Sequence, residues 1–378
     1  MAKRRGNHEG SITHLKDGRW QGRLSLRNGK RKAVYGKTRD ECRRKLDALK
    51  RRIDDGTFSD TDMTVKQYLE KWLEYRALEV KPKTLSDYNY TCKKYIIPKI
   101  GKKKLARLSV LDVQDMMQEL AGEKGPKIAN RGRKVLNNAL GQALRWQVIV
   151  RNPVDAIKRL KEEKPAMILW DYEEAARFRE VARGHELYSF FLLIMSTGMR
   201  LSEMLGFRWR DVEGASVHIC HTATEVNGKL VFGETTKTDH SNRMVSLPED
   251  VVIALAEHRH AQQARYARLG FTPSHDLVFS SRVGTPLSVS NLRKTYKALQ
   301  QEARVPHATL HELRHWHASM LIEEGMDIRA IARRLGHADP SITLRIYAHI
   351  FNKQSREKAI SLDDVLPRVG ERAAAYLN

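Results

Sequence analysis

The basic residues of this chain are distributed so unevenly that they divide it into parts with different surface chemistry. Residues 1–58 hold 18 Lys and Arg against 7 Asp and Glu, and residues 59–160 hold 21 against 11. The remaining 218 residues are almost balanced, with 29 basic and 27 acidic side chains. Because 378 residues suffice for two or three domains, this pattern predicts two small basic modules followed by a larger, nearly neutral one.

The net charge of +23 indicates a polyanionic partner, and nucleic acid explains it better than a merely solvated surface. The longest apolar run, Phe190–Met195, is too short to span a membrane, and no secretory signal follows the N-terminus. The three cysteines, Cys42, Cys92 and Cys220, are widely spaced and lack a CxxC pair. We therefore expect a cytoplasmic protein without disulfides or a cysteine zinc site, and without a membrane partner.

The first module, residues 1–58, predicts a small three-stranded sheet backed by one helix. Asp17-Gly18 and Asn28-Gly29 are typical of two-residue hairpin turns, which need positive φ. Apolar and polar residues alternate over residues 20–27, as in a half-buried strand with a basic outer face. Thr38 predicts a helix N-cap before one apolar stripe, formed by Cys42, Leu46, Leu49 and Ile53. Such a sheet fits the major groove of DNA.

The second module, residues 63–162, follows a polar linker over 59–62 and predicts a helical bundle with basic loops. Lys81-Pro82 predicts a helix start, and residues 108–120 predict a further helix. Two stretches repeat the i, i+3, i+4, i+7, i+8 spacing of an amphipathic helix, one through Val65, Tyr68, Leu69, Trp72 and Leu73, the other through Leu136, Ala139, Leu140, Ala143 and Leu144.

The third module, residues 163–378, predicts a mixed α/β fold that is mainly helical, so the whole chain is a multidomain α+β protein. Helices are expected near 171–182 and 186–196, before a break at Gly198. Strands are expected at 216–226, 229–232 and 243–247, and helices return from about 251 onwards.

Four short stretches of this module carry polar residues in a characteristic order. They are Thr197-Gly198-Met199-Arg200-Leu201-Ser202-Glu203, Thr236-Lys237-Thr238, His311-Glu312-Leu313-Arg314-His315, and Leu335-Gly336-His337 with Tyr347 ten residues beyond. Each alone is typical of an ordinary surface or core position. Together they closely resemble the motifs of the tyrosine recombinase (integrase) family: a Gly-x-Arg-x-x-Glu arginine, a β-hairpin lysine, a His-x-x-Arg, a Leu-Gly-His and a C-terminal tyrosine.

The resemblance implies a site-specific DNA recombinase of a phage or mobile element, with three modules in known roles. Residues 1–58 resemble an arm-type DNA-binding domain, residues 63–162 a core-binding domain and residues 163–378 the catalytic domain. The catalytic positions are filled by Arg200, Lys237, His311, Arg314, His337 and Tyr347, with Glu203 as the acidic neighbour.

The chemistry of these residue types agrees with the resemblance. Two arginines suit the non-bridging oxygens of a phosphodiester, because they stay protonated and offer forked donors. Lys237 is expected to protonate the leaving 5′ oxygen, His311 to deprotonate Tyr347, and His337 to bind a phosphate oxygen. Attack would give a 3′-phosphotyrosyl bond that a 5′ hydroxyl can reverse, so neither ATP, a metal ion nor a cofactor is expected.

The resemblance also implies partners. These are double-stranded DNA with core-type and arm-type attachment sites, further copies of the chain in a homotetramer on a Holliday junction, an excisionase and a host DNA-bending protein. Two DNA-binding modules would raise the effective concentration of the second site.

The helices that carry the motifs have clear start and stop signals. Thr309 predicts an N-cap that places His311 and Arg314 on one face of a helix. Gly325 and Gly336 predict helix ends. Asp339-Pro340 predicts a short helix that carries Tyr347 beside a stripe of Ile342, Ile346 and Ile350, and that is able to dock or withdraw.

Two other classes of protein compete with this interpretation. His311–His315 matches H-E-x-x-H, which in zinc metalloproteases provides two ligands and a general base. A third ligand is needed, but no H-x-x-G-x-x-H extension follows, His317 is too close to serve, and Glu323 or Glu324 would have to supply it without further support. A protease also leaves the basic charge of residues 1–160 unexplained. An inert DNA-binding regulator explains the charge and leaves the ordered motifs unexplained.

Overall fold

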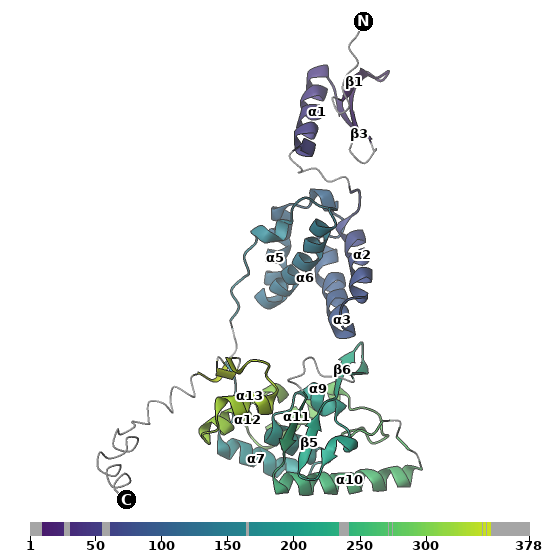
Figure 1. The fold of residues 1–378 in the computed structure, drawn as a ribbon. Coiled ribbons are helices and arrows are strands. Elements are labelled where there is room, and N and C mark those ends of the chain that lie inside the picture. The colour runs from purple at the N-terminus through teal and green to yellow at the C-terminus, as the bar shows by residue number, and fades with distance from the viewer. Residues whose placement is uncertain are drawn as a thin grey trace, which may run out of the picture. The chain divides into compact units, whose positions relative to one another are not determined.

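The computed structural model describes residues 10–25, 31–54, 61–163, 166–233, 242–270, 272–273, 275–341, 343–344 and 346–348. The chain divides into two compact units, residues 1–164 and residues 165–378 (Figure 1). No helix in this described part has the length and apolar character that a membrane span requires.

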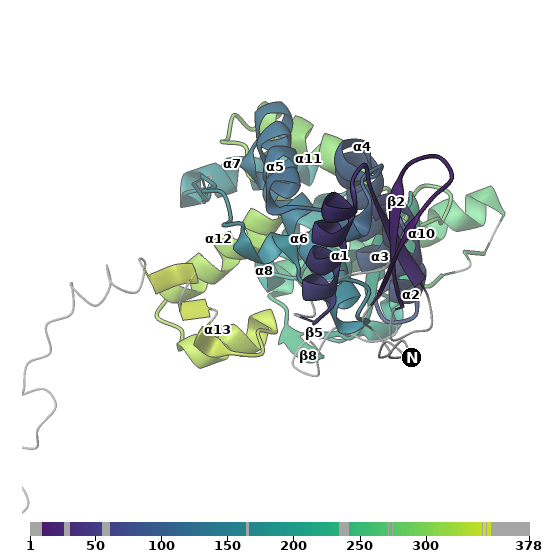
Figure 2. The same ribbon diagram turned by 90° about the horizontal axis from the view of Figure 1, so that it is seen from above.

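The sheet predicted near the N-terminus is present. It consists of β1 (Ser11–His14), β2 (Trp20–Ser25) and β3 (Arg31–Gly36), all antiparallel, and α1 (Arg39–Asp54) lies along it (Figure 2). The side chain of Thr38 accepts a hydrogen bond from the backbone N–H of Glu41, as a helix cap does. Leu24 from the sheet and Cys42 and Leu46 from the helix are buried.

The first hairpin turn differs from the prediction in its length. Leu15 and Arg19 are hydrogen-bonded across the turn, so the loop has three residues, from Lys16 to Gly18, and not two. Gly18 has φ +82°, the left-handed conformation that closes a three-residue loop. Asp17 caps the turn by accepting hydrogen bonds from the backbone and side chain of Arg19. The second predicted turn, Asn28-Gly29, lies outside the described residues.

A helical bundle follows the sheet in the sequence. Its helices are α2 (Val65–Ala77), α3 (Pro82–Thr91), α4 (Ile97–Ile100), α5 (Val110–Lys124) and α6 (Pro126–Arg145). Shorter helical turns join them at Cys92–Ile96, Leu105–Arg107 and Pro153–Ala156.

The predicted apolar stripes of the bundle form its core, with one exception. Val65, Tyr68, Leu69 and Trp72 of α2 are buried. On α6 the stripe is buried as far as Ala143, whereas Leu144 is 39% exposed, contrary to the prediction. Eight residues at 100° each bring Leu144 about 80° away from Leu136, to the edge of the buried arc.

The second unit is built around one mainly apolar helix, α8 (Tyr188–Thr197), whose side chains are nearly all buried. Helices α7 (Tyr172–Arg183), α10 (Glu249–Leu269) and α12 (Leu310–Glu323) pack against it. Another helix, α11 (Val289–Glu302), packs on α7. Burial on all sides explains why α8 shows no apolar periodicity in the sequence.

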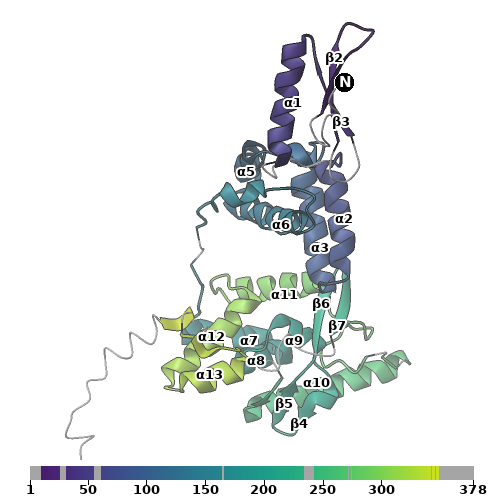
Figure 3. The ribbon, with the colours of Figure 1, turned by 45° about the horizontal axis from the view of Figure 1, so that its top comes forward.

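Two small sheets accompany these helices. The first contains β4 (Val212–Glu213), β5 (Ser216–Ile219) and β8 (Arg243–Ser246), with β5 in the centre. The second is the hairpin of β6 (Thr222–Val226) and β7 (Lys229–Gly233), visible in Figure 3.

The strand predicted over 216–226 is thus two strands, broken at Cys220-His221. The reason is that β6 leaves the first sheet and packs against α9 (Leu201–Gly206). The contact is so close that a Cβ on Gly206 would lie 2.6 Å from the carbonyl carbon of Thr222. Asn227 and Gly228 join β6 to β7 with φ of 50° and 78°, as the sequence predicted for a two-residue turn.

The C-terminal part of the described chain contains α13 (Ile328–Leu335) and a stretch whose described residues, 340–341, 343–344 and 346–348, are helical. Within that stretch Tyr347 packs into a small core with residues of α12 and α13. Ile342 and Ile350 of the predicted stripe lie outside the described side chains. The predicted fold class, a multidomain α+β protein with a mainly helical C-terminal module, is confirmed.

Candidate active site

The site is organised by the C-terminal ends of two helices. Both α8 and α13 end at a left-handed glycine, Gly198 with φ 64° and Gly336 with φ 67°. The last carbonyl groups of a helix have no partner within it and carry a partial negative charge. These two helix ends therefore offer acceptors that suit cationic side chains.

Arg314 of α12 donates hydrogen bonds to both helix ends. It donates to the carbonyl oxygen of Gly198 and to that of Leu335, each at 2.6 Å. Its Nη2 also lies 3.0 Å from Nε2 of His337. The residue is only 2% exposed, so burial and the nearby Arg200 lower its pKa, although an arginine with such partners stays charged.

Arg200 is held beside it by a carboxylate and by the end of α13. Its Nη1 donates to Glu203 at 2.7 Å and its Nη2 donates to the carbonyl oxygen of Gly336 at 2.9 Å. Glu203 is 1% exposed and also pairs with Arg243 of β8 at 2.9 Å. Although burial opposes it, these two arginines hold the pKa of Glu203 below its ordinary value.

A further arginine, Arg334, adds hydrogen bonds to this arrangement. Arg334 donates to the carbonyl oxygen of Ser196, near the end of α8, at 3.0 Å and to Nε2 of His317 at 3.2 Å. Its own carbonyl oxygen accepts a 2.7 Å hydrogen bond from Arg243. Arg243 and Arg334 thus fix the two helix ends against each other.

His337 links the arginines to the segment that carries the tyrosine. Its Nε2 faces Arg314, while its Nδ1 lies 2.8 Å from the hydroxyl of Thr343. Burial, followed by the charges of Arg314 and Arg200, lowers the pKa of His337 to about 4. A neutral ring can accept from Arg314 at Nε2 and donate from Nδ1 to Thr343.

The phenol of Tyr347 is hydrogen-bonded to His315. The phenol oxygen lies 2.6 Å from Nδ1 of His315, and Tyr347 is 1% exposed. Burial raises the pKa of the phenol, whereas burial and then His311 and Arg314 lower the pKa of His315 to about 4. Both groups are therefore neutral near pH 7.

The histidine expected to act as base, His311, contacts His315 and not the phenol. The ring centroids of His311 and His315 are 4.7 Å apart in an edge-to-face arrangement, and His311 is exposed. Desolvation, then the charges of Arg314 and Arg200, also lower the pKa of His311. The geometry thus shifts the interaction with Tyr347 by one helical turn, from His311 to His315.

Most of the residues predicted from the sequence converge here. Arg200, Arg314 and His337 are joined by hydrogen bonds through the two helix ends, and Tyr347 is hydrogen-bonded to His315, the residue that follows Arg314 on α12. Lys237 lies outside the described residues. Arg243, Arg334 and Thr343 were not predicted from the sequence, nor was the contact of His315 with Tyr347. One signal was available, since alternation along β8 places Arg243 on the same buried face as Val245.

The H-E-x-x-H interpretation does not fit the observed bonds. The carboxylate of Glu312 accepts hydrogen bonds from the backbone N–H groups of Thr309 and Ile168, so it caps the helix and is not a base for a bound water. Among the described residues, the side chains whose ligand atoms converge closely enough to hold a metal ion are Asp211, Cys220 and His221.

Comparisons of the sequence point to one family. Residues 166–354 match the phage integrase family, and residues 64–121 match the N-terminal SAM-like domain of phage integrases. A XerC-like tyrosine recombinase of Caldanaerobacter subterraneus is 29% identical, over 89% of this chain and 93% of the relative. An integrase of Streptomyces ambofaciens is 28% identical, over 97% and 99% of the two chains.

Solved structures with the same fold are integrases bound to DNA. The Tn1549 transposon integrase in complex with transposon right end DNA has a TM-score of 0.66 at 21% identity, covering 78% of this chain and 98% of that one. A lambda integrase tetramer bound to a Holliday junction has a TM-score of 0.57 at 18% identity, covering 87% and 96%. These likenesses support the fold assignment.

Acidification is expected to destabilise the second unit through its buried histidines. His317 is 1% exposed, and burial followed by Arg334 lowers its pKa from 6.5 to about 3. Between these values the unfolded chain binds a proton that the folded chain does not. The stability that the neutral ring of His317 contributes to the fold is therefore complete above pH 6.5. As the pH falls below this value, the free energy of unfolding decreases by about 1.4 kcal/mol per pH unit.

Urea unfolding of the second unit from about pH 7 to about pH 5 measures this slope, and His317→Gln should make it shallower by about one proton. His260→Gln, at an exposed position of α10, is the control and should keep the wild-type slope. An unchanged slope in His317→Gln would show that His317 does not stay neutral in the fold.

Proposed function

Since the chain belongs to the phage integrase family and is a site-specific recombinase that cleaves and rejoins DNA, we propose that Tyr347 is its nucleophile. The observation that carries this proposal is the short hydrogen bond between the Tyr347 phenol and a neutral histidine beside buried arginines. The phenol oxygen attacks the phosphorus and forms a 3′-phosphotyrosyl bond while the 5′ oxygen leaves. Reversal by a 5′ hydroxyl joins the strands without ATP.

Arg200 and Arg314 bind the phosphate that is attacked. Each guanidinium has five N–H donors. Bonds within the described residues use two on Arg200 and, with His337, three on Arg314. The remaining donors, and the ring of His337 once DNA displaces its present partners, are available to non-bridging oxygens, whose charge increases in the transition state.

His315 accepts the proton of the phenol as the oxygen–phosphorus bond forms. Its Nδ1 already lies within hydrogen-bond distance of the phenol, and its lowered pKa keeps that nitrogen unprotonated near pH 7. His311, stacked edge-to-face on His315, keeps that ring in place. Lys237 protonates the leaving 5′ oxygen, in the role that the family resemblance assigns to it.

The N-terminal sheet is proposed to bind arm-type DNA. On β2, Gly22 and the side chain of Leu24 are buried towards α1, which leaves Arg23 of β2 and Arg31 of β3 exposed on the opposite face. An exposed β-ribbon with arginines fits the major groove and the phosphates beside it. The helical bundle, residues 63–162, together with residues 163–378 holds the core site.

We assign the assembly by analogy. The lambda integrase structure is a tetramer on a Holliday junction, and this chain is proposed to act as a homotetramer on two duplexes, exchanging strands in pairs. Its site of action is the bacterial cytoplasm, where an excisionase and a host DNA-bending protein set the direction of integration or excision of a phage or mobile element.

Replacing the nucleophile tests the proposal directly. Tyr347→Phe should bind core-site DNA like the wild type and form no covalent adduct, because only the attacking oxygen is removed. A nicked suicide substrate followed by denaturing electrophoresis detects the adduct. An adduct of equal yield from Tyr347→Phe would assign the nucleophile to another residue.

A substrate with an activated leaving group separates the proposed base, His315, from the proposed acid, Lys237. His315→Ala should slow covalent attachment on the order of 10²- to 10⁴-fold, the range of general base catalysis. A 5′-phosphorothiolate leaves without a proton, so it should rescue Lys237→Ala and not His315→Ala. His311→Ala should show the smaller loss of rate. The opposite order, with His315→Ala near wild type, would return the base to His311.

The sheet is tested by a charge-matched pair of variants. Arg23→Ala should weaken binding to arm-type DNA and reduce the slope of log Kd against log salt by about 0.9, the value for one lost phosphate contact. Arg44→Ala removes the same charge from an exposed position on α1 and should keep both affinity and slope. Equal effects of the two substitutions would contradict a specific role for the sheet.

A further inference from the structure

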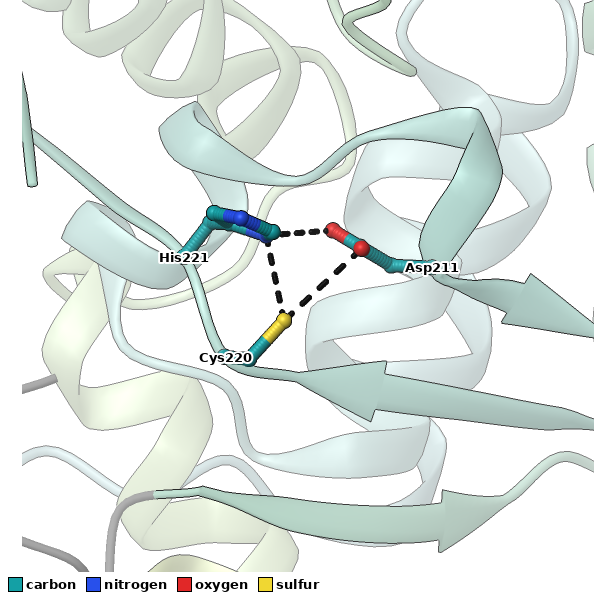
Figure 4. Close-up of side chains that lie close together, drawn as sticks. All are labelled: Asp211, Cys220 and His221. Atoms are coloured by element: carbon teal, nitrogen blue, oxygen red, sulfur yellow. Dashed lines mark hydrogen bonds and ion pairs between the residues drawn. The ribbon is translucent and has the colours of Figure 1, made fainter. Parts of the chain in front are cut away.

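Three potential metal ligands converge at a point that the recombination chemistry does not use. Asp211 ends the helical turn Trp209–Asp211, and Cys220 and His221 form the break between β5 and β6. Figure 4 shows the three side chains pointing toward one another. The Nδ1 of His221 lies 2.9 Å from Asp211 Oδ2 and 3.1 Å from Cys220 Sγ, and the thiol lies 3.7 Å from Asp211 Oδ1.

This arrangement differs from that of a catalytic triad. A proton relay needs the nucleophile on one ring nitrogen of the histidine and the carboxylate on the other. Here the carboxylate and the thiol both approach Nδ1, while Nε2 lies 3.3 Å from Arg210. Donor atoms that face a common point from three sides suit a cation, since each can direct a lone pair at it.

We propose that Asp211, Cys220 and His221 form a binding site for a zinc-type divalent cation. Zinc binds thiolate at about 2.3 Å and imidazole or carboxylate at about 2.0 to 2.2 Å. In a tetrahedron those lengths separate the donors by roughly 3.2 to 3.6 Å. The separations of 2.9 and 3.1 Å require an opening of only a few tenths of an ångström. A thiolate, an imidazole and a carboxylate favour zinc over magnesium or calcium.

Burial supports this site. The side chains of Asp211 and His221 are only 6% and 14% exposed. Among the described residues, the side chains that contact the carboxylate of Asp211 through polar atoms are Cys220 and His221. A buried carboxylate needs a nearby cation or several hydrogen bonds to stay ionised. Binding releases one proton, because the thiol becomes a thiolate while the proton on Nδ1 of His221 moves to Nε2.

Arg210 competes with the metal ion. Its guanidinium has only donors, so its contact with Nε2 of His221 holds that nitrogen as the acceptor and keeps the proton on Nδ1. Arg210 is exposed and free to turn into solvent. Removing it should therefore favour metal binding, in contrast to the removal of any ligand.

The bound ion would be structural. It would join the helical turn Trp209–Asp211 to Cys220 and His221, which directly precede β6 at the base of the β6–β7 hairpin. A fourth position is left for water. None of the three residues belongs to the hydrogen-bonded arginine and histidine cluster of the active site, so DNA cleavage should proceed in excess EDTA.

Cobalt(II) is the probe for the test, because thiolate coordination gives an intense charge-transfer absorption in the near ultraviolet. The full-length protein should show this band at one equivalent, and zinc should abolish it by competition. Cys220→Ser should lose the band, and Arg210→Ala should bind cobalt at least about 3-fold more tightly. His218→Gln, a substitution at a neighbouring histidine whose Nε2 pairs with Asn242, is the control and should bind as the wild type does.

Thermal unfolding provides a second readout. Zinc should raise the Tm of the wild type and of His218→Gln and leave that of Cys220→Ser unchanged. The proposal is overturned if the wild type gives no thiolate band, or if Cys220→Ser keeps it. Weaker cobalt binding by Arg210→Ala would likewise contradict the proposal that Arg210 competes with the metal ion by keeping the proton on Nδ1 of His221. Cleavage that is lost in EDTA would contradict the separation of this site from catalysis.

Discussion

The second unit depends on helix C-terminal carbonyl groups that accept hydrogen bonds from arginines. Arg200, Arg314, Arg243 and Arg334 lie close together, yet Glu203 is the carboxylate that faces them in the described structure. Their other acceptors include backbone oxygens near the ends of α8 and α13, together with ring nitrogens of His317 and His337 and the carbonyl oxygen of Ser246. An uncompensated buried guanidinium would be very unfavourable, so the two helix ends must meet at this position for the unit to fold.

The same cluster explains why the neighbouring histidines remain neutral. Burial is the larger cause of the lowered pKa values, and the charge of Arg314 adds to it at both His315 and His337, with Arg200 contributing at His337. An unprotonated imidazole is what a phenol proton requires as its acceptor. In the proposed mechanism these arginines would therefore both attract the phosphate and help to keep the two histidines neutral.

The sequence revealed those parts of the site that local signals mark. Gly198, Gly336 and Thr309 end or start helices as predicted, and these signals mark the helix ends at which the arginines and histidines of the motifs lie. Arg243 and Arg334 escaped notice because their contacts depend on which strand and helix end meet, which is set by tertiary packing. His311 was predicted as the base, and the contact of Tyr347 with His315 likewise depends on tertiary packing. The strand break at Cys220-His221 follows from the packing of β6 on α9, which no short pattern announces.

The burial of Tyr347 has a consequence for the timing of the reaction. Tyr347, the nucleophile that we propose, is 1% exposed and cannot reach a phosphate while it stays in this position. Under that proposal, productive complexes form from a conformation in which the segment that carries Tyr347 has moved. The observed rate of cleavage is the intrinsic rate multiplied by the population of that conformation. Thr343 lies on the same segment and is hydrogen-bonded to Nδ1 of His337. Movement of the segment would therefore also free this ring nitrogen for the proposed phosphate contact. In the proposed mechanism, cleavage would therefore wait until Tyr347 and His337 have both left their present contacts.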